Sequence, residues 1–167
     1  MNTWLELLKN DNYLGIKKYI QNGADVSQTN EIGESVFACA LRAGCCKETL
    51  MLLIESGADI FHCDEEGVSV FDMAITYDNV EIVNYLIEQG KDVNEITRKS
   101  GFSSLMGAAC YGRVEITKIL LTNGANPSIK DSKGFTAIDF ARKMNKKSIL
   151  EVLDYDENSP KNTGYAR

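Results

Sequence analysis

The sequence predicts an all-α fold, a solenoid of stacked helix-turn-helix units joined by hairpin-like finger loops. One observation is a short segment that returns along the chain as NGADV, SGADI, QGKDV and NGANP, with its glycines 34, 33 and 34 residues apart. Another is that the last three copies each follow a stretch with apolar residues at helical spacing. Such a period is typical of repeat proteins, in which each unit is too small to bury its own apolar face and must stack on its neighbours.

The first helix of each repeat is expected to begin at a hydroxyl residue that follows a glycine-containing turn. The hydroxyl oxygen can accept a hydrogen bond from a backbone N–H group of the first helical turn. The residues in this position are Ser35, Ser69, Ser103 and Thr136. Asp72 and Asp139 each lie three residues after one of them, and this spacing predicts capping boxes. Alanines at equivalent later positions allow close packing of neighbouring helices: Ala40, Ala74, Ala108 and Ala141.

A second helix follows in each repeat, and it carries more of the apolar residues. Its copies read ETLMLLIESG, EIVNYLIEQG and EITKILLTNG. The final glycine of each copy is expected to adopt the left-handed conformation that stops a helix: Gly57, Gly90 and Gly124. This phase places repeats at about 1–30, 31–63, 64–97 and 98–130, with a truncated cap at 131–153. The polar tail, 154–167, is expected to be disordered.

The pattern resembles the ankyrin-repeat family, most closely in GFSSLMGAACYGRVEITKILLTNGANP, and the resemblance extends over about residues 1–153. It implies a module that binds another protein, as an adaptor, an inhibitor or a regulatory partner, through a concave face of finger loops and first helices. One departure is that the family's Thr-Pro-Leu-His sequence is intact in no repeat. In the family that histidine helps to tie neighbouring loops together, so its absence predicts a less rigid array.

Charge is distributed unevenly along the chain, whose net charge is −6. Residues 1–84 carry a net charge of −9, whereas residues 85–167 carry +3. Insertions at 43–46 and 96–100 also indicate binding, because loop insertions in repeat proteins often lie on the binding face. The predicted partner-binding surface therefore has an acidic end, an apolar centre and a basic end. Its residues are Glu31, Glu34, Glu65, Glu66, Val68, Tyr77, Phe102, Tyr111, Lys99, Lys133, Arg142 and Lys143.

Two simpler interpretations of these residues stay open. Scattered surface charge is enough to keep a repeat protein in solution, and packing explains Tyr77 and Tyr111 as well as contact with a partner does. The sharper interpretation is an interface with aromatic anchors, flanked by charges that orient the partner. Nucleic acid is a poor candidate partner, because the net charge is negative and binding to phosphates needs a broad basic surface.

The chemistry-bearing residues do not form the pattern of an enzyme or a metal site. A cysteine, a tyrosine, an arginine and a glutamate gather at 110–115, but Glu115 lies at the start of a second helix, where a negative charge suits the helix dipole. His62 is the only histidine and stands beside Cys63, and no CxxC or HxxxH spacing would complete a zinc site. No serine lies in the strand-turn-helix context of a catalytic nucleophile. We therefore expect neither catalysis nor a bound cofactor.

The alternative function is that of a carrier or chaperone for a small ligand such as haem or a metal ion. Its donors would be Tyr77, Tyr111, His62 or the thiols. The cysteines are odd in number and two are adjacent, which suits a reducing compartment better than a disulfide framework: Cys39, Cys45, Cys46, Cys63 and Cys110. The sequence has no secretory signal and no apolar run as long as a membrane helix, so we expect a cytoplasmic monomer.

Overall fold

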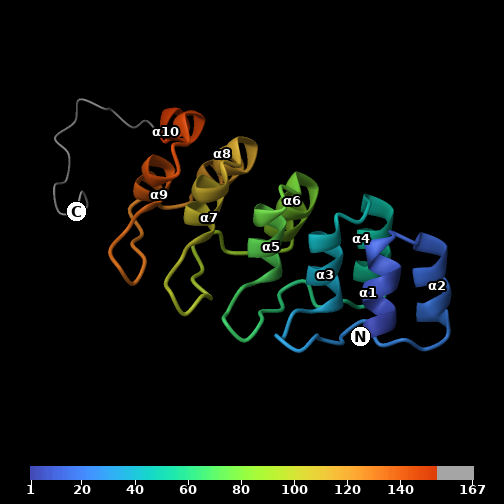
Figure 1. Ribbon diagram of the computed structural model, residues 1–167. Helices are drawn as coiled ribbons and strands as arrows, with labels where there is room; N and C mark the ends of the chain where they lie inside the picture. Colours follow the sequence, from blue (N-terminus) through green and yellow to red (C-terminus); the bar gives the residue numbers. More distant parts are fainter. Residues whose placement is uncertain (154–167) are drawn as a thin grey trace, which may run out of the picture. The chain divides into compact units, whose positions relative to one another are not determined.

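The computed structural model describes residues 1–153, which fold into ten α-helices connected by turns and loops (Figure 1). The helices are α1 (Asn2–Lys9), α2 (Tyr13–Gln21), α3 (Val36–Ala43), α4 (Lys47–Glu55), α5 (Val70–Thr76), α6 (Val80–Glu88), α7 (Ser104–Tyr111), α8 (Val114–Thr122), α9 (Ala137–Lys143) and α10 (Lys147–Val152). This arrangement of helix pairs confirms the all-α fold class that the repeat pattern predicted. The tail for which disorder was predicted, 154–167, lies outside the described residues.

Pairing of extended backbone is confined, in the part of the chain that the structure describes, to single bridges within two finger loops. Thr29 pairs with Ser35, and Cys63 pairs with Ser69. Each bridge closes a loop immediately before a first helix begins. None of the described helices is long and apolar enough to cross a membrane.

The chain divides into two compact units, and the first runs from Met1 to Asn79. Its first helices lie in a row, with α3 packed between α1 and α5, while α2 packs on α1 and α4 packs on α3 (Figure 1). Each helix of the row contributes one fully buried aromatic ring to the core: Trp4, Phe37 and Phe71. The indole N–H of Trp4 donates to the carbonyl oxygen of Asp25 at 3.1 Å. Stacking therefore buries rings that no single repeat could bury alone.

The second unit begins at Val80. Within it α7 packs against α8 and α9, α10 packs against α8 and α9, and α6 packs against α8. The core side chains are aliphatic: Leu86, Leu105, Met106, Leu120 and Ile149. Complete burial of such a side chain contributes roughly 1.5–3 kcal/mol, so these contacts between repeats are the main stabilising interactions of the unit.

The first helices begin with the predicted cap chemistry. All four predicted hydroxyls accept a backbone N–H bond, at the starts of α3, α5, α7 and α9. Both predicted capping boxes are formed. The Ser69 N–H donates to Asp72 Oδ2 at 3.0 Å, and the Thr136 N–H donates to Asp139 Oδ2 at 2.9 Å. These bonds satisfy backbone groups that have no partner within the helix itself.

The second helices end at left-handed glycines, as predicted. The φ angles are 93°, 95° and 85° at Gly57, Gly90 and Gly124. After α4, the Gly57 N–H donates to the Ile54 carbonyl at 3.0 Å, and the Ala58 N–H donates to the Leu53 carbonyl at 3.0 Å. This pair of bonds is a Schellman motif, which needs a residue that adopts positive φ without strain.

Other residues connect neighbouring repeats where the family's histidine is missing. In the first unit, His62 Nε2 lies 2.7 Å from the Gly33 carbonyl oxygen, so this nitrogen is the donor. In the second unit, the Asn94 side chain donates to the Gly124 carbonyl at 2.9 Å and accepts from the Asn126 N–H at 2.8 Å. The prediction of a less rigid array rested on the absence of the family's histidine. These bonds tie neighbouring finger loops together in its place.

The turn with the extra residue, 43–46, joins α3 to α4 and is held by a residue of the preceding repeat. Asp11 accepts a hydrogen bond from the Cys46 N–H at 3.0 Å and another from the Thr49 hydroxyl at 2.7 Å. Burial raises the pKa of Asp11, but the hydrogen bonds from Thr49 and Cys46 lower it by more, so the pKa lies below its usual value. The carboxylate thus stays charged at the start of α4, where the helix dipole favours it.

Candidate protein-interaction surface

On the first unit, most of the predicted contact residues are accessible. Glu31, Glu65 and Glu66 are exposed in the finger loops. Val68 is half-buried at the end of the loop that leads into α5, and Tyr77, the residue that ends α5, is 42% exposed. Three of these five accessible side chains are acidic, and whether they act together as a contact surface stays a prediction.

Glu34 differs from the other predicted acidic residues because it is buried, with 7% of its surface exposed. Its Oε2 atom lies 2.8 Å from Nη1 of Arg42. The Asn30 side chain donates to the same oxygen at 2.6 Å. A carboxylate that is paired and desolvated in this way holds the finger loop against α3, and removing one partner of such a pair is costly. Glu34 therefore stabilises the finger loop and adds little to the exposed acidic surface.

On the second unit, three phenylalanine rings form a cluster that one arginine contacts. Phe102 and Phe140 meet edge to face with their centroids 5.0 Å apart, and Phe135 lies 6.1 Å from Phe140. The Arg98 guanidinium lies 5.1 Å from the centre of the Phe102 ring. Arg142 is half-buried, and the other predicted basic residues are exposed: Lys99, Lys133 and Lys143.

Phe135 and Phe140 were missed by the sequence analysis. Phe135 directly precedes the cap residue of α9, as Phe102 directly precedes that of α7. Its position in the repeat was therefore enough to predict it as a contact residue equivalent to Phe102. Phe140 lies inside α9, and its contact with Phe102 depends on how α9 packs against α7. That packing is a tertiary feature with no local signature.

Tyr111 is the last residue of α7 and is 44% exposed, with the Arg113 guanidinium 6.0 Å from its ring centre. Tyr77 occupies the equivalent place in the preceding repeat, since each tyrosine follows a buried alanine by three positions. The two rings belong to different units. The apolar centre of the predicted partner-binding surface, to which both rings were assigned, stays a prediction.

Three of the residues suggested as donors for a small ligand are poorly suited to that role: His62, Cys39 and Cys45. His62 is bonded to a backbone carbonyl. Burial raises the pKa of the Cys39 thiol to about 11 and that of the Cys45 thiol to about 12, so both stay protonated and unreactive at neutral pH. Within residues 1–153, no three His, Cys, Asp or Glu side chains gather in a way that could hold a metal ion. The carrier alternative stays a prediction that none of these contacts supports.

Comparison with known proteins agrees with the repeat pattern. A family model described as ankyrin repeats in three copies matches residues 6–97, and a model of a single ankyrin repeat matches residues 100–132. The chain is 43% identical over 85 residues, 51% of its length, to the E3 ubiquitin-protein ligase hecd-1 of Caenorhabditis elegans. It is 48% identical over 69 residues, 41% of its length, to the E3 ubiquitin-protein ligase Ufd4 of Drosophila melanogaster.

A viral relative is closer in size. The chain is 36% identical over 90 residues, 53% of its length, to the ankyrin repeat protein R664 of Acanthamoeba polyphaga mimivirus, and the match covers 55% of that protein. By contrast, the matches cover only 3% of the nematode ligase and 2% of the fly ligase. The similarity to the ligases is thus a similarity to a short repeat segment within much longer proteins.

Proposed function

The chain belongs to the ankyrin-repeat family, and we propose that it is a protein-binding module whose contact surface is built from finger loops and first helices. Ankyrin repeats generally bind other proteins and are typically not catalytic. The proposal extends this to the role of an adaptor, an inhibitor or a regulatory partner. The observation that supports it is the charge and the aromatic content of the equivalent surfaces on the two units.

These surfaces have opposite charge. Segments 30–44 and 64–78 of the first unit contain seven acidic residues and one basic residue, whereas segments 98–112 and 131–145 of the second contain five basic residues and two acidic ones. Exposed tyrosine and half-exposed phenylalanine rings lie in the same segments. Aromatic anchors flanked by charge are typical of protein interfaces, where the charges set orientation and association rate. A partner would present a basic region to the first unit and an acidic region to the second.

The remaining parts of the proposal follow from the same chemistry. The chain acts without catalysis or a cofactor, as a monomer in the cytoplasm, where its five free cysteines stay reduced. Nucleic acid is not the partner, because the basic residues occupy only part of a chain whose net charge is −6. The ligase activity named for two relatives is not part of the proposal, because the chain matches so little of either protein.

Affinity capture from cells with quantitative mass spectrometry tests this proposal. The full chain would be compared with a surface variant, in which Tyr77 and Tyr111 are both replaced by alanine. A matched control would carry Lys17→Ala and Lys118→Ala, two exposed positions on the second helices α2 and α8. We expect at least one protein whose recovery falls about tenfold with the surface variant and is unchanged with the control. If every captured protein responds to both variants alike, the proposed surface is wrong.

A further inference from the structure

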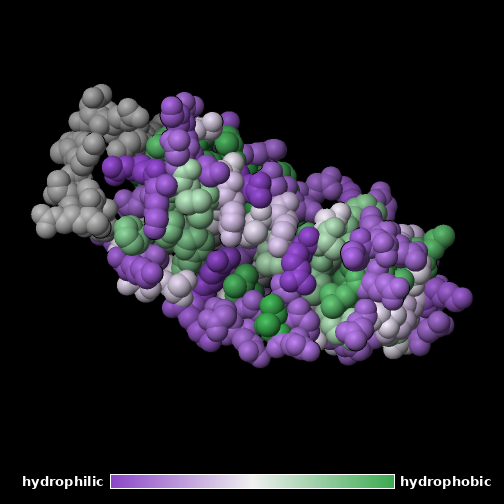
Figure 2. Space-filling model, in the orientation of Figure 1, coloured by the Kyte–Doolittle hydropathy of each residue, from purple (hydrophilic) through white to green (hydrophobic). Residues whose placement is uncertain are grey.

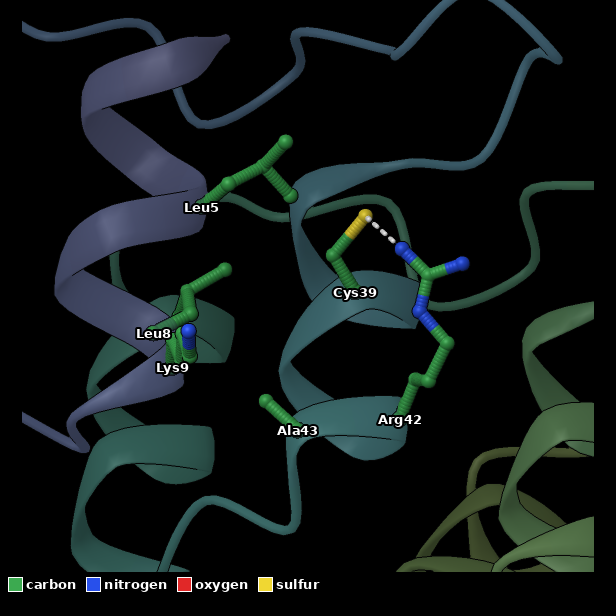
Figure 3. Close-up of a pocket in the computed structure, with 6 residues that line it drawn as sticks. All are labelled: Leu5, Leu8, Lys9, Cys39, Arg42 and Ala43. Atoms are coloured by element: carbon green, nitrogen blue, oxygen red, sulfur yellow. Dashed lines mark hydrogen bonds between the residues drawn. The ribbon is translucent and has the colours of Figure 1, made fainter.

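A hollow of about 260 Å³ lies between α1 and α3 in the first unit. Its lining residues are Leu5, Leu8 and Lys9 on α1 and Cys39, Arg42 and Ala43 on α3. Figure 3 shows Leu5 and Ala43 pointing toward the opposite helix, whereas the Arg42 side chain points away from α1 and meets the Cys39 thiol. Leu5 remains 36% exposed although it is a large apolar side chain. In the space-filling view, a hydrophobic area lies over these two helices among largely hydrophilic surroundings (Figure 2).

A second hollow of about 470 Å³ shares Leu5 with the first and lies beside the finger loop that leads into α3. Its lining includes Glu31 and Ile32 from that loop. Ile32 is 58% exposed, which makes it one of the most accessible large apolar residues of the described chain. Leu5 thus borders both hollows, and we call the two together the groove.

Charged side chains stand at both ends of this groove. Glu31 stands at the end near the finger loop, and Lys9 stands at the other end, in the last turn of α1. Lys9 has no acidic partner among the described residues. Arg42 lies beyond it on α3, but its charge is compensated by buried Glu34, and its Nη2 lies 3.7 Å from Cys39 Sγ. Glu31 and Lys9 are thus the charged side chains of the groove that a bound molecule can pair with. The N-terminal ammonium of Met1 also borders the hollow at the Glu31 end, where it donates to Gln28 Oε1 at 3.1 Å.

The floor of the groove is neutral. Burial raises the pKa of the Cys39 thiol to about 11, and the neighbouring Glu34 carboxylate raises it as well. At neutral pH the thiol is therefore a small, weakly polar surface next to Leu8 and Ala43. Away from Lys9, an uncharged side chain therefore fits this floor better than a charged one, which would lose hydration there.

We propose that this groove binds an extended peptide segment of a partner protein, with an acidic residue beside Lys9, an apolar residue over Leu5 and Ile32, and a basic residue beside Glu31. This inference rests on the proposed protein-binding function and names the partner chemistry for one part of its surface. The peptide's length follows from α1, whose 8 residues span about 12 Å. An extended peptide rises about 3.3 Å per residue, so about four residues reach from one charged end to the other.

Selection from a phage-displayed library of random peptides on the full chain tests the inference. We expect the enriched peptides to share an acidic, an apolar and a basic residue, in that order or its reverse, within about four positions. Synthetic versions of these peptides would then be titrated against variants of the chain. Leu5→Asp and Ile32→Asp should each weaken binding about tenfold or more. Leu14→Asp is the matched control, because Leu14 is 76% exposed on α2, away from the groove lining.

A charge exchange tests the orientation. Lys9→Glu should weaken the selected peptides several-fold, and replacing the acidic residue of the peptide by lysine should restore the affinity to that variant. Such rescue identifies a direct pair, because a variant that is merely misfolded would bind neither peptide. Circular dichroism melting curves of all variants check that the fold is retained.

Several results would overturn the inference. Enriched peptides that lack the charge pattern, or that bind Leu5→Asp and Ile32→Asp as well as the unchanged chain, would show that the groove is not used. So would an empty selection, or a dimer in sedimentation that Leu5→Asp dissociates, since a second copy would then cover the groove. If the peptides respond to Tyr111→Ala instead, the groove is wrong while the protein-binding function stands. If the capture experiment also yields no protein whose recovery depends on Tyr77 and Tyr111, the proposed protein-binding function is wrong as well.

Discussion

The two units of the chain use acidic residues in the same places for the same structural purpose, yet their surfaces differ in charge. Asp64 and Asp131 both accept two backbone N–H bonds within a finger loop. Asp72 and Asp139 both complete capping boxes. These four carboxylates belong to the framework of the repeat. The difference in charge between the units therefore comes from the positions that the framework leaves open.

Those open positions are acidic in the first unit and basic in the second. In segments 30–44 and 64–78 of the first unit, the exposed acidic residues are Glu31, Glu65, Glu66 and Asp78. The corresponding segments of the second expose Lys99, Lys133 and Lys143. Substitutions at exposed positions usually change the free energy of unfolding by less than about 0.5 kcal/mol. The positions that set the charge of each surface are therefore separate from those that hold the fold, so that one set can change while the other stays.

The largest expected effect tests whether the framework is common to both units. Phe71 and Leu105 follow equivalent glycines by four positions, and both are fully buried. Phe71→Ala should lower the free energy of unfolding by about 3–5 kcal/mol and Leu105→Ala by about 2–5 kcal/mol. Urea unfolding followed by circular dichroism measures both. A loss below about 1 kcal/mol in either variant would mean that its unit does not depend on the shared core.

The next effect tests whether the open positions carry recognition. Replacing Tyr77 and Tyr111 together by alanine should weaken a captured partner at least about tenfold, or roughly 1.4 kcal/mol, with little loss of fold. The single variants show which unit contributes more, by isothermal titration calorimetry with the purified partner. Lys17→Ala and Lys118→Ala should leave the affinity unchanged. If the lysine changes abolish binding and the tyrosine changes do not, the second helices form the interface; if the tyrosine pair unfolds the chain, the rings belong to the core.

A smaller effect compares the two capping boxes directly. Asp72→Ala and Asp139→Ala should each lower the free energy of unfolding by about 1 kcal/mol, because each removes two acceptor contacts at the start of a first helix. Asp72 is the more deeply buried of the two, so its loss should be the larger. Chemical denaturation gives both values. If either substitution left the free energy of unfolding unchanged, the capping box would stabilise only one of the two units.

The smallest effect concerns the pH dependence of the first unit. The folded pKa of Asp11 lies below its usual value, so its stabilising contribution is present above the unfolded pKa of about 3.9 and is lost as pH falls through the folded pKa. Asp11→Asn should lower stability at pH 7 by up to about 1 kcal/mol and flatten the loss of stability below about pH 4. Glu6→Gln, on the exposed surface of α1, is the control. Thermal melts at several pH values distinguish the two variants, and identical profiles would contradict the prediction.

Local features of the fold could be predicted from the sequence because they depend on residues close together in the chain. A serine followed three residues later by an aspartate is enough to form a capping box, as Ser69 and Asp72 do. A glycine after an apolar helix is enough to end it, as Gly124 does after α8. Repetition strengthened each of these signals, because a pattern that is ambiguous once becomes clear when it returns at a fixed interval.

The rest depends on contacts between distant segments, for which the sequence offers no local signal. Glu34 is a charged residue in a finger loop and was therefore predicted to be exposed, but Arg42 and Asn30 hold it in a buried position. The groove beside Leu5 was not predicted, since its shape arises from the packing of α1 against α3. The contact residues themselves stay a prediction, because charge and exposure describe what a surface can bind without identifying the partner.

The carboxylate of Asp11 couples the folding of the first helix pair to that of the second. In a linear array, total stability is a sum of intrinsic terms for each repeat and interface terms between nearest neighbours. The bonds from Asp11 to Cys46 and Thr49 belong to the interface term, since they connect the α1–α2 turn to the start of α4. When α1 and α2 open, the amide of Cys46 loses its acceptor. Hydrogen exchange at that single amide therefore reports the cooperativity with which the end of the array frays.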